Sequence, residues 1–216
     1  MGLYTLYTIH MTITPATASV LAEMTSQQSD IEMMIGVGLN KESDAVFFQY
    51  LGEEQQPSAL MLPSGKPLTR LANVKLHSIS VVENVGTFNA TKLNVYLESS
   101  QGRIVMLTSG LNTLWSQFLV CGLSGLQQEY ALDAPFTLDS WKGTSAMRPC
   151  FAAIRADGNK VVDMMLKEQL QEARSDGNQK RVLEIMRDTV GLLSQAIGGP
   201  DVQPAEVVVE SDDMPF

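Results

Sequence analysis

Aromatic and basic side chains occur together in three short stretches of the chain, TKLNVYLES, FTLDSWK and PCFAAIR. Aromatic faces stack on bases and cations contact phosphates, so this combination suits single-stranded nucleic acid, with stacking contributing about 1–3 kcal/mol per base. Because alternate residues of a strand share a face, we expect the aromatic residues of these stretches to point away from the core. The candidate nucleic-acid-binding residues are Lys75, Lys92, Tyr96, Arg103, Trp141, Lys142, Arg148, Phe151 and Arg155.

Each candidate also has a purely structural interpretation. Tyr96 and Phe151 are equally well explained as residues covered by flanking parts of the chain. Trp141 is the better candidate, because Lys142 and a Gly-Thr-Ser loop follow it. Trp115 and Phe118 recur at helical spacing, which indicates core positions. Single lysines and arginines are usually solvated surface residues, so only their coincidence with aromatic residues is informative.

No catalytic pattern is evident. His10 and His77 have no nucleophile partner, and the sequence has neither a glycine-rich phosphate loop nor the spacing of metal ligands. We therefore expect a protein that is not an enzyme and that needs no cofactor or metal. Cys121 and Cys150 lie in apolar surroundings without a CxxC motif, which indicates reduced core residues; a disulfide between them is the alternative.

The net charge of −9 is unevenly distributed. Residues 60–160 carry nine basic and six acidic side chains, whereas residues 1–59 carry one basic and seven acidic side chains. Residues 201–216 contain five acids and no base. A polyanion would therefore meet the basic centre of the chain, and the acidic tail can compete for the same surface.

The central elements predict a mainly β fold with helical additions. The order is a long strand in LTRLANVKLHSISVVENV, a hairpin made by TKLNVYLES and RIVMLTS, a helix in GLNTLWSQFLVCGLSGL, and the strands APFTLDSWK and RPCFAAIRA. Three strands, a helix and two strands is the order of a five-stranded OB-fold barrel. We expect this nucleic-acid-binding domain to occupy residues 68–158.

Three further segments flank this domain. Residues 1–67 form an N-terminal extension, predicted to contain a helix in TPATASVLAEMTSQQSDIEMMIGVGLN and two short strands in DAVFFQYL and SALMLPSG. Residues 159–199 are predicted to form a helical hairpin, and residues 200–216 a flexible acidic tail. The second helix of the hairpin carries one continuous apolar stripe. The stripe suits packing within the domain or a contact in a homo-oligomer.

Two features bear on location. No apolar run approaches the ~18 residues that a membrane-spanning helix needs. The first residues, MGLYTLYTIHMTITP, lack the basic start and the cleavage site of a signal peptide. We expect a cytoplasmic protein without a membrane partner.

The chain ends in SDDMPF, two acids followed by an apolar residue, proline and phenylalanine. This ending resembles the acidic tip of the bacterial single-stranded DNA-binding protein family. The motif covers about six residues, and the strand order of 68–156 is compatible with that family's OB domain. The resemblance implies binding of single-stranded DNA without sequence preference, protection of the strand, and recruitment of replication, recombination and repair proteins. The residues that would carry this recruitment are Asp212, Asp213, Met214, Pro215 and Phe216.

The physical chemistry of the tip suits such a role. Phe216 can fill an apolar pocket, its carboxylate can pair with a basic residue, and Asp212 and Asp213 can meet a basic rim. The chain departs from the family in its long N-terminal extension, in its helical hairpin, and in Met214, where isoleucine is commoner. These departures suggest a divergent, phage- or plasmid-borne member, and they put the family's tetramer in doubt.

A second function is compatible with the same residues. The domain can be a protein-interaction module whose tip mimics and competes with the tails of host single-stranded DNA-binding proteins. Affinity for a strand falls steeply with salt, whereas affinity of an apolar pocket for Phe216 falls much less, so salt dependence separates the two. Sequence does not separate DNA from RNA as the bound strand.

Overall fold

The computed structural model describes residues 31–40, 42–51, 56–86 and 89–198. The tip residues 212–216 and the predicted helix as far as Asp30 lie outside them. The described elements form a mainly β structure with three helices. In chain order they are β1 (Ile31–Val37), β2 (Phe47–Leu51), β3 (Gln56–Ala59), β4 (Arg70–Val85), β5 (Ala90–Ser99), β6 (Ile104–Gly110), α2 (Leu114–Glu129), β7 (Phe136–Lys142), β8 (Cys150–Ala156), β9 (Asn159–Val161), α3 (Met164–Ser175) and α4 (Gln179–Ala196).

The nine strands form one mixed sheet that does not close on itself. Its order is β3-β2-β1-β6-β5-β4-β7-β8-β9. The predicted sequence of three strands, a helix and two strands is present as β4, β5, β6, α2, β7 and β8. A closed five-stranded barrel is not confirmed, because β1 to β3 extend the sheet beyond β6 and β9 extends it beyond β8.

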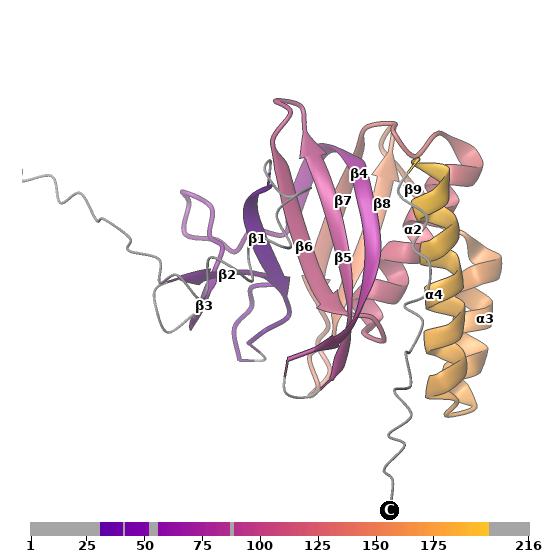
Figure 1. The fold of residues 1–216 in the computed structure, drawn as a ribbon. Coiled ribbons are helices and arrows are strands. Elements are labelled where there is room, and N and C mark those ends of the chain that lie inside the picture. The colour runs from indigo at the N-terminus through magenta and orange to yellow at the C-terminus, as the bar shows by residue number, and fades with distance from the viewer. Residues whose placement is uncertain (1–30, 41, 52–55, 87–88, 199–216) are drawn as a thin grey trace, which may run out of the picture. The chain divides into compact units, whose positions relative to one another are not determined.

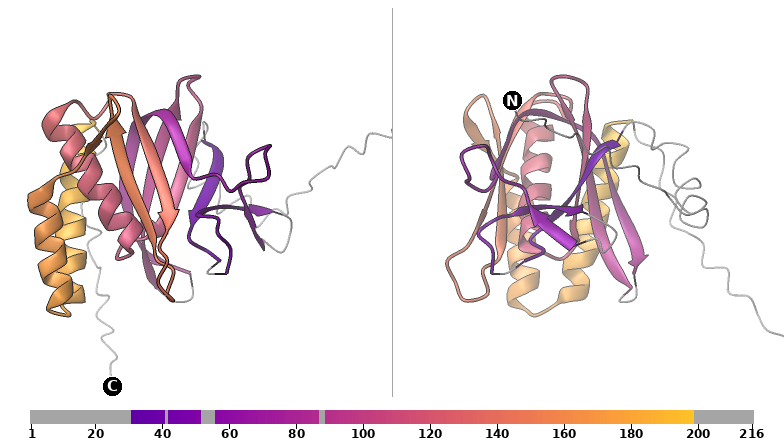
Figure 2. Two further views of the ribbon diagram at one scale, coloured as in Figure 1. Left: turned by 180° about the vertical axis from the view of Figure 1, so that it is seen from behind. Right: turned by 90° about the vertical axis from the view of Figure 1, so that its left-hand side faces the viewer.

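Strand β4 joins the two halves of the sheet. Most of its length pairs with β5, Arg70 and Leu71 pair with β7, and Val74 pairs with both. The register with β7 shifts between Leu71 and Val74, and Asn73 in this stretch has a φ of 55°. Such irregularities bend a strand and increase its twist. Figure 1 accordingly shows β5 and β6 in front of β7 and β8, and Figure 2 (left) shows β7 and β8 nearest the viewer from behind.

The prediction of a helix is wrong over residues 31–37, which form β1. This segment contains two β-branched isoleucines and a valine, which favour a pleated surface. Ile35 and Val37 are buried and belong to the core, and β1 pairs with β2 through Ile35, Gly36 and Val37. Tertiary burial therefore decides the conformation over the helix formers of the preceding sequence.

The alternation predicted for residues 91–99 is confirmed in β5. Leu93, Val95 and Leu97 are fully buried, and the intervening residues are half-buried. Helix α2 is buried around most of its circumference and contacts β6, β8 and β9 as well as both other helices. Trp115 lies in the core, as predicted, where its Nε1 donates a hydrogen bond to Ser140 Oγ at 3.0 Å.

Helices α3 and α4 occupy the segment in which two helices were predicted. Asp163 caps α3 by accepting a hydrogen bond from the Leu166 N–H, and Asn178 caps α4 by accepting one from the Arg181 N–H. Gly177, with a φ of 69°, lies in the short turn between them. Both helices pack on α2, and α4 also contacts β4. Within the described part of the chain, no helix combines the length and the apolar character needed to span a bilayer.

Candidate nucleic-acid interface

Trp141 and Phe151 form an aromatic pair at the end of the β7–β8 hairpin. They are direct partners in the antiparallel register, so both side chains project from the same face of the sheet. Their ring centroids lie 5.8 Å apart and their planes differ by 24°, which is a stacked arrangement. Trp141 keeps 43% of its surface exposed. An indole held against one neighbour and open to solvent elsewhere is suited to stack on a planar ligand.

Phe118 of α2 extends this pair to three rings. Its centroid lies 5.6 Å from that of Phe151, with the planes at 79°, an edge-to-face contact. β9 pairs with β8 only over residues 154–156, so within the described residues β9 does not cover the edge of β8 at Phe151. The sequence predicted Phe118 as a core residue, and it does pack against the core while remaining partly accessible.

Two arginines share one carboxylate beside the aromatic pair. Arg70 Nε lies 2.6 Å from Asp139 Oδ1, and Arg155 Nε lies 2.8 Å from Asp139 Oδ2. Asp139 and Trp141 are two residues apart on β7, and Arg155 and Phe151 are four residues apart on β8, so these side chains lie on one face. This face, defined by Arg70, Asp139, Trp141, Phe151 and Arg155, is termed the aromatic–arginine face.

Asp139 is anionic in this setting. Burial raises the pKa of its carboxyl, but hydrogen bonds from Arg70 and Arg155 outweigh burial, so the pKa lies below its usual range. The same hydrogen bond raises the pKa of the Arg70 guanidinium. At neutral pH the cluster therefore contains two cations and one anion, with a net positive charge beside the exposed indole.

Lys142 and Arg148 were predicted to bind nucleic acid, but their head groups contact the β1–β2 connection instead. Lys142 Nζ donates hydrogen bonds to the carbonyl oxygens of Asn40 and Ser43. Arg148 donates to the Glu42 carbonyl at 3.1 Å and forms an ion pair with Asp44. Burial lowers the pKa of the Lys142 ammonium. Both side chains hold this connection against the β7–β8 hairpin.

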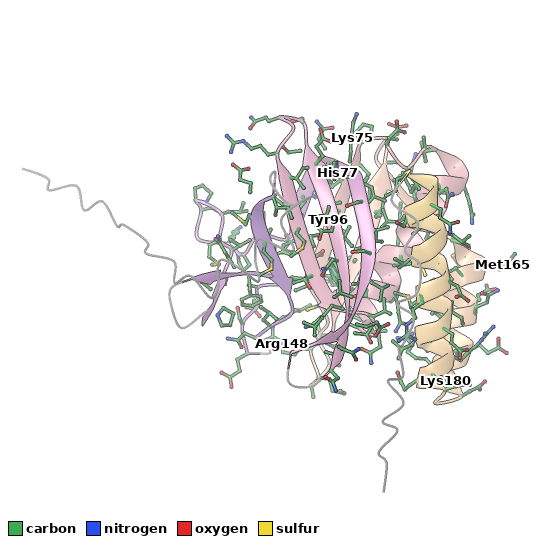
Figure 3. The ribbon with its side chains drawn as sticks, viewed as in Figure 1. Lys75, His77, Tyr96, Arg148, Met165 and Lys180 are labelled. Atoms are coloured by element: carbon green, nitrogen blue, oxygen red, sulfur yellow. The ribbon has the colours of Figure 1, made fainter. Side chains whose placement is uncertain are left out.

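Four further predicted residues lie away from the aromatic–arginine face. Lys75 on β4 and Tyr96 on β5 lie on the front of the sheet in Figure 3, where His77 is also labelled. Tyr96 is half-buried, and burial raises the pKa of its phenol. Lys92 is half-buried on β5, and Arg103 pairs with Glu32 at 3.0 Å. The nine predicted residues therefore do not form one surface, and Trp141, Phe151 and Arg155 are the three that the fold brings together.

Sequence reasoning missed Arg70, Asp139 and Phe118 as members of this region. The signal for Asp139 was present, because it shares the strand period of Trp141. Arg70 was hidden by the register shift near Asn73, which breaks the alternation of β4. No group of three or more His, Cys, Asp or Glu side chains in the described ranges is arranged to hold a metal ion.

Comparisons with protein-family models, with curated proteins and with solved structures find no match to this chain.

Proposed function

We propose that this chain binds single-stranded DNA without sequence preference through the aromatic–arginine face. The observation that carries the proposal is the stacked pair of Trp141 and Phe151, in which a large indole stays 43% exposed beside Arg155. A base can stack on the open surface of Trp141, and stacking favours no particular base because every base has a π-face. We further propose that β4 to β8 with α2 are a divergent, unclosed OB fold.

The arginine pair supplies the contacts to the strand's backbone. Arg70 and Arg155 have side chains that are 62% and 43% exposed, so their remaining N–H groups are accessible to phosphate oxygens. Asp139 orients both guanidinium groups through its two carboxylate oxygens. Contacts to phosphates position a DNA strand but do not distinguish its sequence. They therefore suit a protein that coats DNA of any sequence.

The C-terminal residues are proposed to recruit replication, recombination and repair proteins. This part of the proposal depends on the motif SDDMPF alone. The tip lies outside the nucleic-acid-binding residues in the sequence, so DNA and a protein partner need not compete for the same side chains. The role is that of a binding and recruiting protein, and it requires no catalytic group.

The decisive experiment is fluorescence-anisotropy binding of a labelled poly-dT oligonucleotide at about 50 and about 200 mM salt. The full chain is compared with a chain that ends at Glu210. We expect affinity to fall steeply with salt in both, with a slope in log Kd of about 0.7 per phosphate contacted. Truncation should leave affinity unchanged or raise it, because a tethered polyanion is lost.

Tryptophan fluorescence shows where the DNA strand binds. The chain has two tryptophans, and Trp115 is 1% exposed in the core. Stacking of a base should therefore quench only the emission of Trp141, and the variant Trp141→Phe should lose this quenching. Absence of DNA binding in both chains would refute the proposal and would favour a protein-interaction module that uses the tip as a competitor. A poly-U oligonucleotide tests RNA in the same assay.

A further inference from the structure

A groove between α2 and α3 begins at Phe118, the last of the three contacting aromatic rings. It is lined by Gln117, Phe118, Cys121, Lys167, Leu170, Gln171 and Arg174. On α3, Lys167, Leu170, Gln171 and Arg174 follow helical spacings of three and four and so face the same way. Phe118 belongs to both regions, because it lines this α2–α3 groove and also contacts Phe151 edge-on at 5.6 Å.

The cations of the groove are not neutralised by ion pairs. Lys167 and Arg174 form no salt bridge with any residue that the structure describes. The nearby carboxylate of Asp163 is already occupied, since it accepts hydrogen bonds from the Leu166 N–H, Ser124 Oγ and Gln128 Nε2. The groove therefore combines an apolar floor with two available positive charges, which suits an anionic ligand that also has an apolar part.

Gln117 is the most buried polar side chain in the lining of the groove. This side chain is only 4% exposed, and its Oε1 is buried without a hydrogen-bond partner among the described residues. Its Nε2 donates to the Asn112 carbonyl at 2.9 Å, which fixes the orientation of the amide. Because this oxygen has almost no accessible surface, the amide supports the wall of the groove and leaves ligand contacts to the more exposed lining side chains.

We propose that the α2–α3 groove binds the next nucleotide of a strand held on the aromatic–arginine face. Lys167 and Arg174 contact its phosphates, and the ring of Phe118 borders its base. This inference rests on the proposed function and adds a second subsite to it. Phe118 makes the two subsites continuous, so one strand can occupy both.

The test uses the double variant Lys167→Gln, Arg174→Gln in the full chain. Glutamine keeps a high helix propensity, so α3 should persist. A matched control is Lys180→Gln, Arg181→Gln, which removes two charges from the start of α4, where both side chains pair with Glu184 (Figure 3 labels Lys180). Anisotropy is measured with oligo-dT of about 4 and about 12 nucleotides, a range that spans the site sizes of OB folds.

We expect the groove variant to bind the short oligonucleotide normally and the long one about 5- to 30-fold more weakly. Its salt slope with the long oligonucleotide should fall by about 1.4, corresponding to two lost phosphate contacts. The control variant should match the wild type. Wild-type affinity of the groove variant at both lengths would overturn this inference and leave the proposed function intact, whereas failure of the wild type to bind either length refutes the proposed function itself.

An acidic peptide is the competing occupant. A synthetic peptide of residues 205–216 is therefore titrated against both variants. Loss of peptide binding by the groove variant, with strand affinity unchanged, would assign the groove to a peptide and overturn the inference.

Discussion

Arg70 Nε and Asp139 Oδ1 lie 2.6 Å apart although 69 positions separate the two residues in the chain. The contact ties the bent start of β4 to β7, and Arg155 completes it from β8. A carboxylate that holds two guanidinium groups also competes with any phosphate for them. The same residue therefore orders the proposed binding face and weakens its attraction for a polyanion.

We expect Asp139→Asn to raise the affinity for poly-dT about three- to tenfold, because both guanidinium groups lose their carboxylate partner. Anisotropy at low salt measures the change. Asp157→Asn is a matched control, because Asp157 lies in the β8–β9 turn and its substitution changes the net charge by the same amount. Equal gains in the two variants would show that only the net charge matters.

Asp139 should also make stability depend on pH. Its folded-state pKa is lowered, so its contribution to the free energy of unfolding is present above the unfolded-state pKa of about 3.9 and is lost as the pH falls through the folded-state value. At neutral pH, Asp139→Asn should cost about 0.5–1 kcal/mol. Urea unfolding of both proteins at several pH values should show the difference shrinking only below about pH 4. A difference that is constant down to the most acidic sample contradicts this assignment.

Trp141→Ala should weaken strand binding by about 1–3 kcal/mol, the contribution of one base stack. It should also lower the free energy of unfolding by about 1–2 kcal/mol, because the indole is more than half buried and stacks on Phe151. Met147→Ala is the control, since Met147 is 78% exposed in the same β7–β8 connection and offers no aromatic face. If both alanine variants bind as the wild type does, Trp141 is not a stacking platform.

The two cysteines should react slowly with alkylating reagents, and to different extents. Burial raises the pKa of the Cys121 thiol to about 12, so almost no thiolate is present at about pH 8. Cys150 is half-buried, and burial raises the pKa of its thiol as well. Mass spectrometry after iodoacetamide treatment should find Cys150 modified before Cys121, with both modified at once in denaturant. Rapid labelling of Cys121 in the native protein would mean that α2 is not packed as described.

One substitution should have opposite effects at two helical glycines. A Cβ at Gly125 of α2 would lie 2.7 Å from the Val162 carbonyl carbon, so Gly125→Ala should destabilise the protein by about 1–3 kcal/mol. At Gly191 of α4 an added Cβ meets no atom within 4 Å, and Gly191→Ala should stabilise it by about 0.5–1 kcal/mol. Denaturant unfolding measures both. A neutral result at Gly125 would place α2 farther from the chain at residues 162–163.

The sequence by itself determined the features that follow from local periodicity. The alternation of Leu93, Val95 and Leu97 predicted the buried face of β5, and the helical spacing around Trp115 predicted α2. The outward direction of Trp141 followed from its phase relative to Phe136 and Leu138. These predictions hold because side-chain direction in a strand or helix repeats over a few residues, which neighbouring positions reveal.

Only the tertiary structure decided which residues meet. The identity of residues 31–37 as a strand depends on pairing with β2 and on burial, which local helix propensity does not encode. The contact of Arg70 with Asp139 depends on the register shift in β4, and the contacts of Lys142 with Asn40 and Ser43 join segments about 100 positions apart. Many carboxylates and carbonyl groups could pair with a given cation, and the long-range register of the sheet decides which one does. Lys142 therefore holds the β1–β2 connection, whereas Arg155 lies beside the exposed indole of Trp141.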